Sequence, residues 1–289
     1  MTIQTTISRL YARLDLHLPS GYKPGMELSG KVAVITGASM GIGEAIAKLF
    51  VEQGAQAVML SRDAGRAEAA RARIGHPEQT LALACDVRHR EEIDRVVGLT
   101  MHHFNHIDIW INNAGHGLLD SIASVKMSDF RELFDTNLFG TVEGMQAVIP
   151  IMKQQGSGTI VNVSSVAGHI PIPFHGSYSA TKFAMNAIGK AARIELADAG
   201  INVLTVCPGY VKTDFAANAV RGAEAKRVRA ASMRGISVER VARAVLRGIQ
   251  RRKREVVVPW TMHPSIKIYQ MFPGIIDAVL SRMAKKLSS

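Results

Sequence analysis

Short apolar runs alternate with helical stretches over most of this sequence. The first run, residues 31–36, is compact and rich in β-branched side chains, which is typical of a buried parallel strand. Similar runs occupy residues 57–60, 81–84, 107–111, 159–163, 201–206 and 255–259. Apolar residues at helical spacing fill residues 44–50, 91–103 and 127–153, the stretch that begins at Tyr178, and the stretch after Ser237. The alternation predicts an α/β fold with a parallel sheet.

Two amphipathic extensions flank this core. Residues 1–18 carry apolar side chains at helical spacing and are followed by prolines and glycines, so residues 1–28 are expected to form an N-terminal arm. Residues 260–289 are expected to form a C-terminal tail with a second amphipathic helix. Residues 29–259 then form the main domain, within which residues 210–236, rich in small side chains and arginine, are expected to act as a lid.

Composition places the chain among soluble proteins. Hydrophobic residues make up 47% of the sequence, but no apolar run reaches about 18 residues, so no transmembrane helix is expected. The N-terminus lacks the apolar core of a signal peptide. Cys85 and Cys207 are interpreted as buried free thiols, which predicts a reducing, cytoplasmic location. The loosely clustered histidines have no partner at ligand spacing and are interpreted as surface residues, so no metal is predicted: His102, His103, His106 and His116.

The positive charge is concentrated in one segment. The net charge is +11, and residues 219–254 hold twelve Lys/Arg against two acidic residues. Such a segment attracts anionic partners, for which acidic lipid, an acidic carrier protein, a phosphorylated substrate and nucleic acid are the candidates. Nucleic acid is disfavoured because the segment has no interleaved aromatic residues and no binding motif. The alternative is a solvated basic face without a partner.

A glycine-rich turn follows the first strand. Gly37, Gly41 and Gly43 lie between the strand 31–36 and the helix 44–50. Glycines let the backbone approach a pyrophosphate, and the helix N-terminus supplies unpaired N–H groups. The turn therefore predicts a dinucleotide site.

The end of the second strand bears on the choice of dinucleotide. An acidic residue here would bind the ribose hydroxyls of NAD, but the chain has Ser61 followed by Arg62. An arginine suits the 2′-phosphate of NADP, so NADP(H) is favoured over NAD(H). Asp63 is the alternative, because its carboxylate could bind the ribose hydroxyls of NAD instead.

Tyr178 and Lys182 are the candidate catalytic pair. At spacing i and i+4 on a helix, the two side chains lie on one face, one turn apart. A neighbouring ammonium favours the phenolate, so the pair can form a general acid/base near neutral pH. Ser165 lies thirteen residues before Tyr178. Taken alone, the pair is better explained as a surface tyrosine near a surface lysine, and only the accompanying motifs favour the catalytic interpretation.

Further residues complete a recognisable pattern. They are Asn112–Gly115 after the fourth strand, Asn137 in the helix 127–153, and Pro208, Gly209 and Thr213 after the sixth strand. With the glycine-rich turn, Ser165 and Tyr178-x-x-x-Lys182 in this order, residues 29–259 resemble the classical short-chain dehydrogenase/reductase (SDR) family. The resemblance implies a single Rossmann-like, doubly wound domain whose seven-stranded parallel sheet is flanked by helices.

The resemblance also implies a role for each matched residue. Tyr178 would be the general acid/base, Lys182 would lower its pKa and hold the nicotinamide ribose, and Ser165 would bind the substrate oxygen. Asn137 would hold a water that links Lys182 to solvent. The implied dinucleotide contacts are Gly37, Ser39, Gly41, Ile42 and Gly43 at the pyrophosphate, Arg62 at the 2′-phosphate, Asp86 and Val87 beside the adenine, Asn113, Ala114 and Gly115 along the adenosine, Tyr178 and Lys182 at the ribose, and Pro208, Gly209 and Thr213 at the nicotinamide end.

The expected function is an NADP(H)-dependent oxidoreductase that interconverts a secondary alcohol and a ketone. Met40 departs from the basic residue that NADP-preferring relatives often carry before Gly41, which leaves Arg62 as the main discriminator. The alternatives are an NAD-dependent dehydrogenase of the same family and a non-catalytic dinucleotide-binding regulatory protein.

The resemblance extends to partners. The tail is similar to that of lipid-, retinoid- and steroid-acting relatives, which implies a bulky apolar small-molecule substrate, an acyl ketone included. Family habit implies a homodimer or homotetramer. The basic segment and the amphipathic ends are expected either to contact an anionic membrane or acidic carrier, or to pack between subunits.

Overall fold

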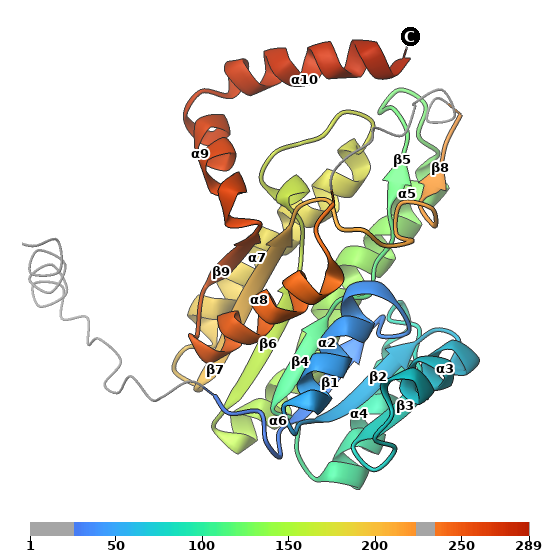
Figure 1. Ribbon diagram of the computed structural model, residues 1–289, viewed down its shortest axis with the longest axis vertical. Helices are drawn as coiled ribbons and strands as arrows, with labels where there is room; N and C mark the ends of the chain where they lie inside the picture. Colours follow the sequence, from blue (N-terminus) through green and yellow to red (C-terminus); the bar gives the residue numbers. More distant parts are fainter. Residues whose placement is uncertain (1–25, 224–234, 289) are drawn as a thin grey trace, which may run out of the picture.

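A seven-stranded parallel sheet forms the centre of the protein (Figure 1). The computed structural model describes residues 26–223 and 235–288, so the expected arm helix at 1–18 and part of the expected lid lie outside the described residues. The strands, in the order β3-β2-β1-β4-β6-β7-β9, are β1 (Val32–Thr36), β2 (Gln56–Ser61), β3 (Thr80–Ala84), β4 (Ile109–Asn112), β6 (Gly158–Val163), β7 (Ile201–Pro208) and β9 (Glu255–Val258). All seven predicted strands are confirmed, and every pair is parallel.

Helices cover both faces of this sheet (Figure 1). One face carries α2 (Gly41–Glu52), α3 (Ala64–Ile74) and α8 (Val238–Gln250), and the other carries α4 (Arg90–Phe104), α6 (Gly140–Gln155) and α7 (Gly176–Glu195). Phe50 and Val245 are fully buried in the first core, and Ile93 and Val148 in the second. The arrangement is the doubly wound Rossmann-like fold that the resemblance implied.

The prediction of a single long helix over residues 127–153 is wrong in one respect. It is divided into α5 (Met127–Phe134), a π-helical turn η1 (Asp135–Phe139) and α6. Asn137 lies in the π turn and is fully buried. An apolar stripe cannot reveal such a turn, because one extra residue per turn shifts the pattern by less than the width of the stripe. π turns often occur at functional positions.

A small second sheet covers the carboxyl end of the main one. β5 (Leu118–Leu119) pairs in parallel with β8 (Val220–Arg221), which belongs to the described part of the expected lid. Each strand has two residues, too few to show a period of two in the sequence. The pairing holds the lid segment close to the strand ends.

The C-terminal tail contains more helix than expected. After a short 3-10 turn η4 (Trp260–Met262), α9 (His263–Met271) and α10 (Pro273–Ser288) lie beyond the carboxyl end of β9 (Figure 1). The sequence indicated the second of these helices but not the first. In the described parts of the chain, no helix is long and apolar enough to cross a membrane.

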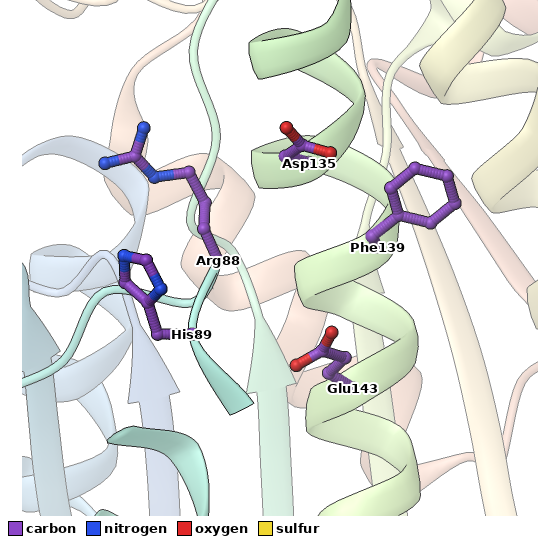
Figure 2. Close-up of a pocket in the computed structure, with 5 residues that line it drawn as sticks. All are labelled: Arg88, His89, Asp135, Phe139 and Glu143. Carbon is purple, nitrogen blue, oxygen red and sulfur yellow. The ribbon is translucent and has the colours of Figure 1, made fainter. Parts of the chain in front are cut away.

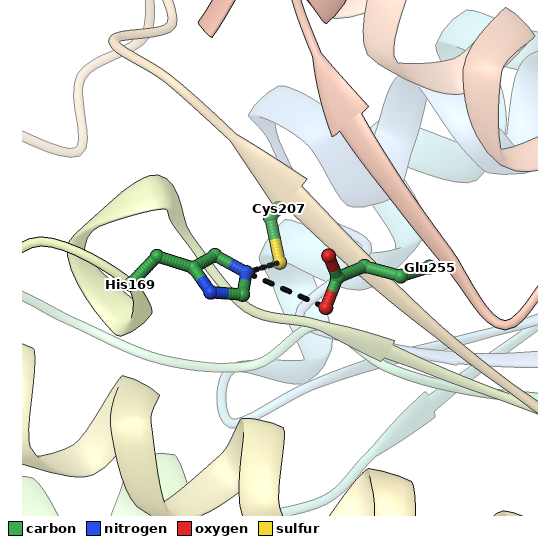
Figure 3. A group of neighbouring side chains, drawn as sticks. All are labelled: His169, Cys207 and Glu255. Atoms are coloured by element: carbon green, nitrogen blue, oxygen red, sulfur yellow. Dashed lines mark hydrogen bonds and ion pairs between the residues drawn. The ribbon is translucent and has the colours of Figure 1, made fainter. Parts of the chain in front are cut away.

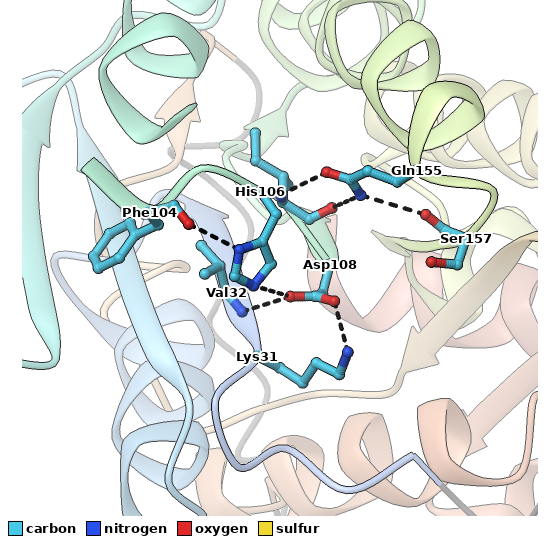
Figure 4. Close-up of polar contacts among 8 residues, drawn as sticks. Lys31, Val32, Phe104, His106, Asp108, Gln155 and Ser157 are labelled. Carbon is cyan, nitrogen blue, oxygen red and sulfur yellow. Dashed lines mark hydrogen bonds and ion pairs between the residues drawn. The ribbon is translucent and has the colours of Figure 1, made fainter. Parts of the chain in front are cut away.

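A polar network closes the opposite, amino-terminal edge of the sheet (Figure 4). Asp108 Oδ1 accepts from Lys31 Nζ at 2.9 Å, while its Oδ2 accepts from Val32 N at 2.9 Å. His106 Nε2 lies 3.0 Å from the same Oδ2, and its Nδ1 lies 2.8 Å from Phe104 O. His106, interpreted from sequence as a surface histidine, thus helps to fasten β4 to β1.

Replacing Asp108 tests this network. Asp108→Asn removes a charge that Lys31 and His106 share, and we expect a loss of about 1–3 kcal/mol in the free energy of unfolding, measured by urea denaturation. Asp94 pairs with Arg90 on the exposed surface of α4, so Asp94→Asn is the control and should change stability by about 0.5 kcal/mol or less. Equal losses in the two variants would contradict the role of Asp108.

Candidate active site

The four predicted catalytic residues converge at the carboxyl end of β6. Ser165 lies two residues after that strand, Tyr178 and Lys182 project from α7, and Asn137 comes from the π turn. Ser165 Oγ accepts from Ala167 N at 3.1 Å and donates to Pro208 O at 3.4 Å. A hydrogen bond also joins the side chains of Ser165 and Tyr178. The sequence therefore predicted which residues meet, although it placed Asn137 in an unbroken helix.

Lys182 is a buried lysine held against the end of β6. It is 4% exposed, and its Nζ donates to Val163 O at 3.0 Å. The same Nζ lies 5.7 Å from the centre of the Tyr178 ring, so the two side chains share one face of α7 as expected. Burial lowers the pKa of Lys182 to about 8.

The pKa of Tyr178 moves in the direction opposite to the expected one. Burial raises the pKa of this phenol to about 12, and the hydrogen bond with Ser165 offsets that rise only in part. With the chain's own residues alone, the expectation that Lys182 brings the pKa of Tyr178 near neutrality is therefore wrong. These residues keep Tyr178 protonated at neutral pH, and the protonated phenol can donate to a carbonyl oxygen.

Asn137 braces the site through its side chain. Its Nδ2 donates to His116 O at 3.0 Å, and its Oδ1 accepts from His116 N at 3.0 Å. Nδ2 also lies 3.3 Å from Thr181 Oγ1 on α7. These contacts tie the π turn both to the segment after β4 and to the catalytic helix. They position Lys182 and Tyr178, whereas the water-holding role stays a prediction.

The glycine-rich turn has the shape that a dinucleotide requires. Gly37 and Gly41 have φ angles of +64° and +62°, which side-chain-bearing residues rarely adopt. A Cβ on Gly43 would lie 2.5 Å from Gly37 O and 2.6 Å from Asn113 Nδ2. Met40 precedes α2 and makes no capping hydrogen bond with its side chain, so the first N–H groups of α2 remain available. The cradle fits a pyrophosphate.

Polar contacts from the end of β4 hold this turn. Asn113 Nδ2 donates to Thr36 O at 2.9 Å and to Gly37 O at 3.1 Å. Thr36 Oγ1 accepts from the backbone N–H groups of Asn113 and Ala114, both at 2.9 Å. Asn113, expected beside the adenosine, thus also fixes the glycine turn. Thr36, the last residue of β1, had no role assigned from the sequence.

Arg62 and Asp63, the two candidate cofactor contacts after β2, have different surroundings. Arg62 is exposed, whereas Asp63 is the N-cap of α3 and its Oδ1 accepts from Arg66 N at 2.9 Å. Asp86, at the end of β3, is held by Arg88: burial alone would raise the pKa of Asp86, but hydrogen bonds from Arg88 keep it below its usual value. The field of Arg62 lowers the pKa of Asp86 further.

Arg73 is a cation near the cradle that sequence reasoning missed. Its Nη2 donates to Ser39 O at 3.1 Å and its Nε to Glu44 Oε1 at 2.8 Å. The residue comes from the far end of α3, so neither its position in the sequence nor a motif indicated the contact. It fastens the turn from outside.

The lid segment contacts the site through Thr213 and Phe215. A Cβ on Gly41 would lie 3.4 Å from Thr213 Cγ2, which places this threonine against the glycine turn. The ring of Phe215 is 5.7 Å from that of Tyr178, at an interplanar angle of 62°. The ring of His175 is 6.5 Å from that of Tyr178, and burial lowers the pKa of His175. Neither aromatic neighbour was predicted, because the lid and the loop before α7 follow no periodic pattern.

A second cluster joins the loop that follows Ser165 to β7 and β9 (Figure 3). His169 Nε2 is 3.5 Å from Cys207 Sγ and 3.4 Å from Glu255 Oε2. The three residues have metal-ligating side chains, but burial raises the pKa of Cys207 to about 12, and the thiol form is a poor ligand or nucleophile. We interpret the cluster as a hydrogen-bonded brace that holds the loop after Ser165 to β7 and β9.

A cavity of about 390 Å³ lies outside the catalytic residues (Figure 2). Arg88 and His89 line one side of it, while Asp135 and Glu143 line the other, along η1 and α6. Phe139, the last residue of η1, also lines the cavity and is 52% exposed. The cavity contains none of the predicted catalytic side chains.

Comparison with known proteins decides the family. The family model described as short chain dehydrogenase matches residues 31–224. The chain belongs to the short-chain dehydrogenase family. An uncharacterized oxidoreductase of Staphylococcus epidermidis is 36% identical over 203 residues, which cover 70% of this chain and 87% of the relative. This short-chain dehydrogenase is accordingly an oxidoreductase.

Solved structures agree with that assignment. A 3-ketoacyl-(acyl-carrier-protein) reductase from Brucella melitensis, complexed with NADH, is 31% identical with a TM-score of 0.72, covering 80% of this chain and 97% of its own. A short-chain dehydrogenase from Streptomyces avermitilis is 26% identical with a TM-score of 0.75, covering 90% and 97%. A relative from Burkholderia phymatum in complex with NAD shares the fold at 23% identity, with a TM-score of 0.77 and coverage of 86% and 96%.

A methyl group in the cradle tests the dinucleotide site. We expect Gly43→Ala to weaken dinucleotide binding by about tenfold or more, or about 1.4 kcal/mol, because the new Cβ displaces Gly37 or Asn113. Fluorescence titration with NADPH and NADH measures the loss. Gly98 on α4 has open space around it, so Gly98→Ala is the matched control and should bind normally. Normal binding by both variants would refute the assignment.

Proposed function

We propose that the protein is an NADP(H)-dependent oxidoreductase that interconverts a secondary alcohol and a ketone. The observation that carries the proposal is the hydrogen-bonded pair of Ser165 and Tyr178 beside buried Lys182, at the strand ends next to the glycine cradle. A pure binding protein has no need of such a pair. The non-catalytic alternative is therefore not favoured.

Each residue of the site has its own role in the proposed reaction. The hydride chemistry belongs to the nicotinamide, which the cradle, Lys182 and Thr213 would hold. Tyr178, kept protonated by burial, donates its proton to the substrate oxygen during reduction. Ser165 hydrogen-bonds the same oxygen and stabilises the developing negative charge. Lys182, with a pKa of about 8, supplies a positive charge next to the phenol as the proton leaves.

The surroundings of Tyr178 support a bulky apolar substrate. Phe215 and His175 flank the phenol, and burial together with repulsion from Arg221 lowers the pKa of His175, which favours the neutral ring. A neutral aromatic wall suits lipid-, steroid- or retinoid-like ketones and acyl ketones. The reductase from Brucella melitensis, named for a 3-ketoacyl substrate, supports the last of these.

Replacing Ser165 tests the reaction. With a panel of bulky ketones and NADPH, we expect Ser165→Ala to lower kcat about 10²–10³-fold while the dissociation constant of NADPH stays unchanged. Ser164 donates to Lys182 O at 3.3 Å and is the matched control, since Ser164→Ala should lose stability more than turnover. If none of the ketones oxidises NADPH, or if Ser165→Ala turns over normally, the proposal fails.

The preference for NADP(H) rests on Arg62. Its exposed guanidinium stands at the end of β2, and Asp63, the competing ribose ligand, is engaged as the cap of α3. Arg73 adds a second cation near the turn, in place of the basic residue missing at Met40. An NAD-dependent enzyme is the second candidate, because the 31% identical neighbour is complexed with NADH.

Removing Arg62 separates these two candidates. We expect Arg62→Ala to weaken NADPH binding by about tenfold or more, through the loss of a charge-assisted contact, and to leave NADH binding unchanged. Arg66 is exposed one turn later on α3, so Arg66→Ala controls for the general loss of positive charge. Wild-type protein that binds NADH more tightly than NADPH would instead establish the NAD-dependent candidate.

A homo-oligomer completes the proposal. Large apolar side chains are exposed along α7 and the neighbouring π turn: Phe139, Phe183 and Ile194. These helices would be buried in a homodimer or homotetramer, as the family resemblance implied. An acidic carrier protein remains the alternative partner for the basic surface.

A further inference from the structure

The C-terminal tail exposes more large apolar side chains than a solvated surface does. We define the tail face as six residues of η4, α9, α10 and the turn between these helices, which are 42–70% exposed: Trp260, Ile268, Met271, Phe272, Ile275 and Val279. Contiguous exposed apolar groups in a short segment mark an interaction site. Residues 260–288 also lie beyond the part of the chain that matches the family model.

The tail face is separate from the residues that hold the tail in place. Ile266 is 4% exposed and packs in a third apolar cluster with Val166, Ile170 and Val257. Tyr269, Ile276 and Leu280 pack against the same cluster. The helices α9 and α10 therefore have an inner apolar side that is used for folding and an outer apolar side that packing among residues 26–223 and 235–288 does not explain.

A basic groove adjoins the tail face. It has a volume of about 230 Å³ and lies between α8 and β9, where the cations Arg240, Arg247, Arg251 and Lys253 line it. Among the described residues, none of these four side chains forms an ion pair within 4.0 Å. Trp260 and His263, at the start of the tail, line the same groove. Trp260 thus belongs to both surfaces.

We propose that the tail face and the basic groove together dock on an anionic lipid bilayer. The outer apolar side chains of α9 and α10 insert at the boundary of headgroups and acyl chains, as interfacial amphipathic helices do. The groove cations bind headgroup phosphates, because basic side chains next to a membrane are attracted to anionic lipid. Trp260, apolar with one polar N–H, lies at the level of the headgroups.

Charge favours lipid over a second copy of the chain. A symmetric dimer places the same patch on both subunits, so a dimer through this surface would bring four unpaired cations toward their own copies. Like charges across an interface are unfavourable, whereas a negative membrane surface complements them. Lys267 and Arg282, both exposed, extend the positive charge along α9 and α10, where Asp277 is the acidic residue.

The inner side of the tail packs against the loop that follows Ser165. Val166 directly follows Ser165, and it packs in the cluster that carries the tail. Figure 1 shows α9 and α10 beyond the carboxyl ends of the strands, the edge where Ser165 and Tyr178 lie. This further step rests on the proposed function: the substrate would be a ketone or alcohol dissolved in the membrane, which reaches Tyr178 from the lipid side.

Vesicle flotation with the full chain tests the proposal. We expect binding to phosphatidylglycerol-containing vesicles, about tenfold weaker binding to pure phosphatidylcholine, and loss of binding at high salt. The double variant Phe272→Ser/Ile275→Ser and the double variant Arg247→Glu/Arg251→Glu should each bind at least about tenfold more weakly. NADPH titration on every variant verifies the fold and is independent of docking.

Matched variants elsewhere exclude general effects. Leu99 on α4 is 40% exposed, so Leu99→Ser controls for the loss of an apolar side chain, and Arg66→Glu/Lys153→Glu controls for the change of charge. Both controls should float as wild type does. Wild type that stays unbound, or an apolar double variant that floats normally, would overturn the proposal. A change from dimer to monomer in that variant, with vesicle binding unchanged, would assign the tail face to a second copy.

The lipid-side route to the site has its own readout. If docking is correct, activity on a membrane-dissolved ketone should fall in the two docking variants, while activity on a water-soluble ketone is retained. A protein that floats but reduces neither ketone would refute the proposed function and leave docking intact. A protein that reduces both ketones equally well in every variant would refute the lipid-side route.

Discussion

The burial of Lys182 against the end of β6 is the constraint on which the site depends. This residue is 4% exposed, and its ammonium group donates a hydrogen bond to Val163 O. A charged group is expensive to bury, and the cost appears as the fall of its pKa to about 8. The same packing that imposes this cost also brings Tyr178 and Ser165 together.

Small residues permit that packing. A Cβ on Gly168 would lie 2.7 Å from Lys182 O, and one on Gly189 would lie 2.7 Å from Thr205 Oγ1. The helix α7 can therefore approach the loop after Ser165 and the strand β7 only where side chains are absent. Asn137 fixes the same helix from the π turn through Thr181. The position of α7 thus depends on close approaches at these glycines and on the Asn137 side chain.

Much of this could be predicted from the sequence, since both the strands and the motifs are local. The run 31–36 and its six counterparts are mostly apolar, which indicates buried parallel strands. The resemblance to the family indicated Ser165. The π turn, the pair β5–β8 and the Arg73 contact could not be predicted, because each depends on residues brought together by the fold. The pKa of Tyr178 was misjudged because burial raises it, and burial cannot be read from spacing.

The central claim is that burial keeps Tyr178 protonated, ready to donate to a carbonyl. The most direct test is an alkaline titration of the phenolate band, in which the spectrum of Tyr178→Phe is subtracted from that of the wild type. With a pKa of about 12, only about 1% of Tyr178 should be ionised at pH 10, so the difference spectrum should show no phenolate there. Half-ionisation between about pH 6 and pH 8 would contradict the account, and would mean that Lys182 controls the phenol after all.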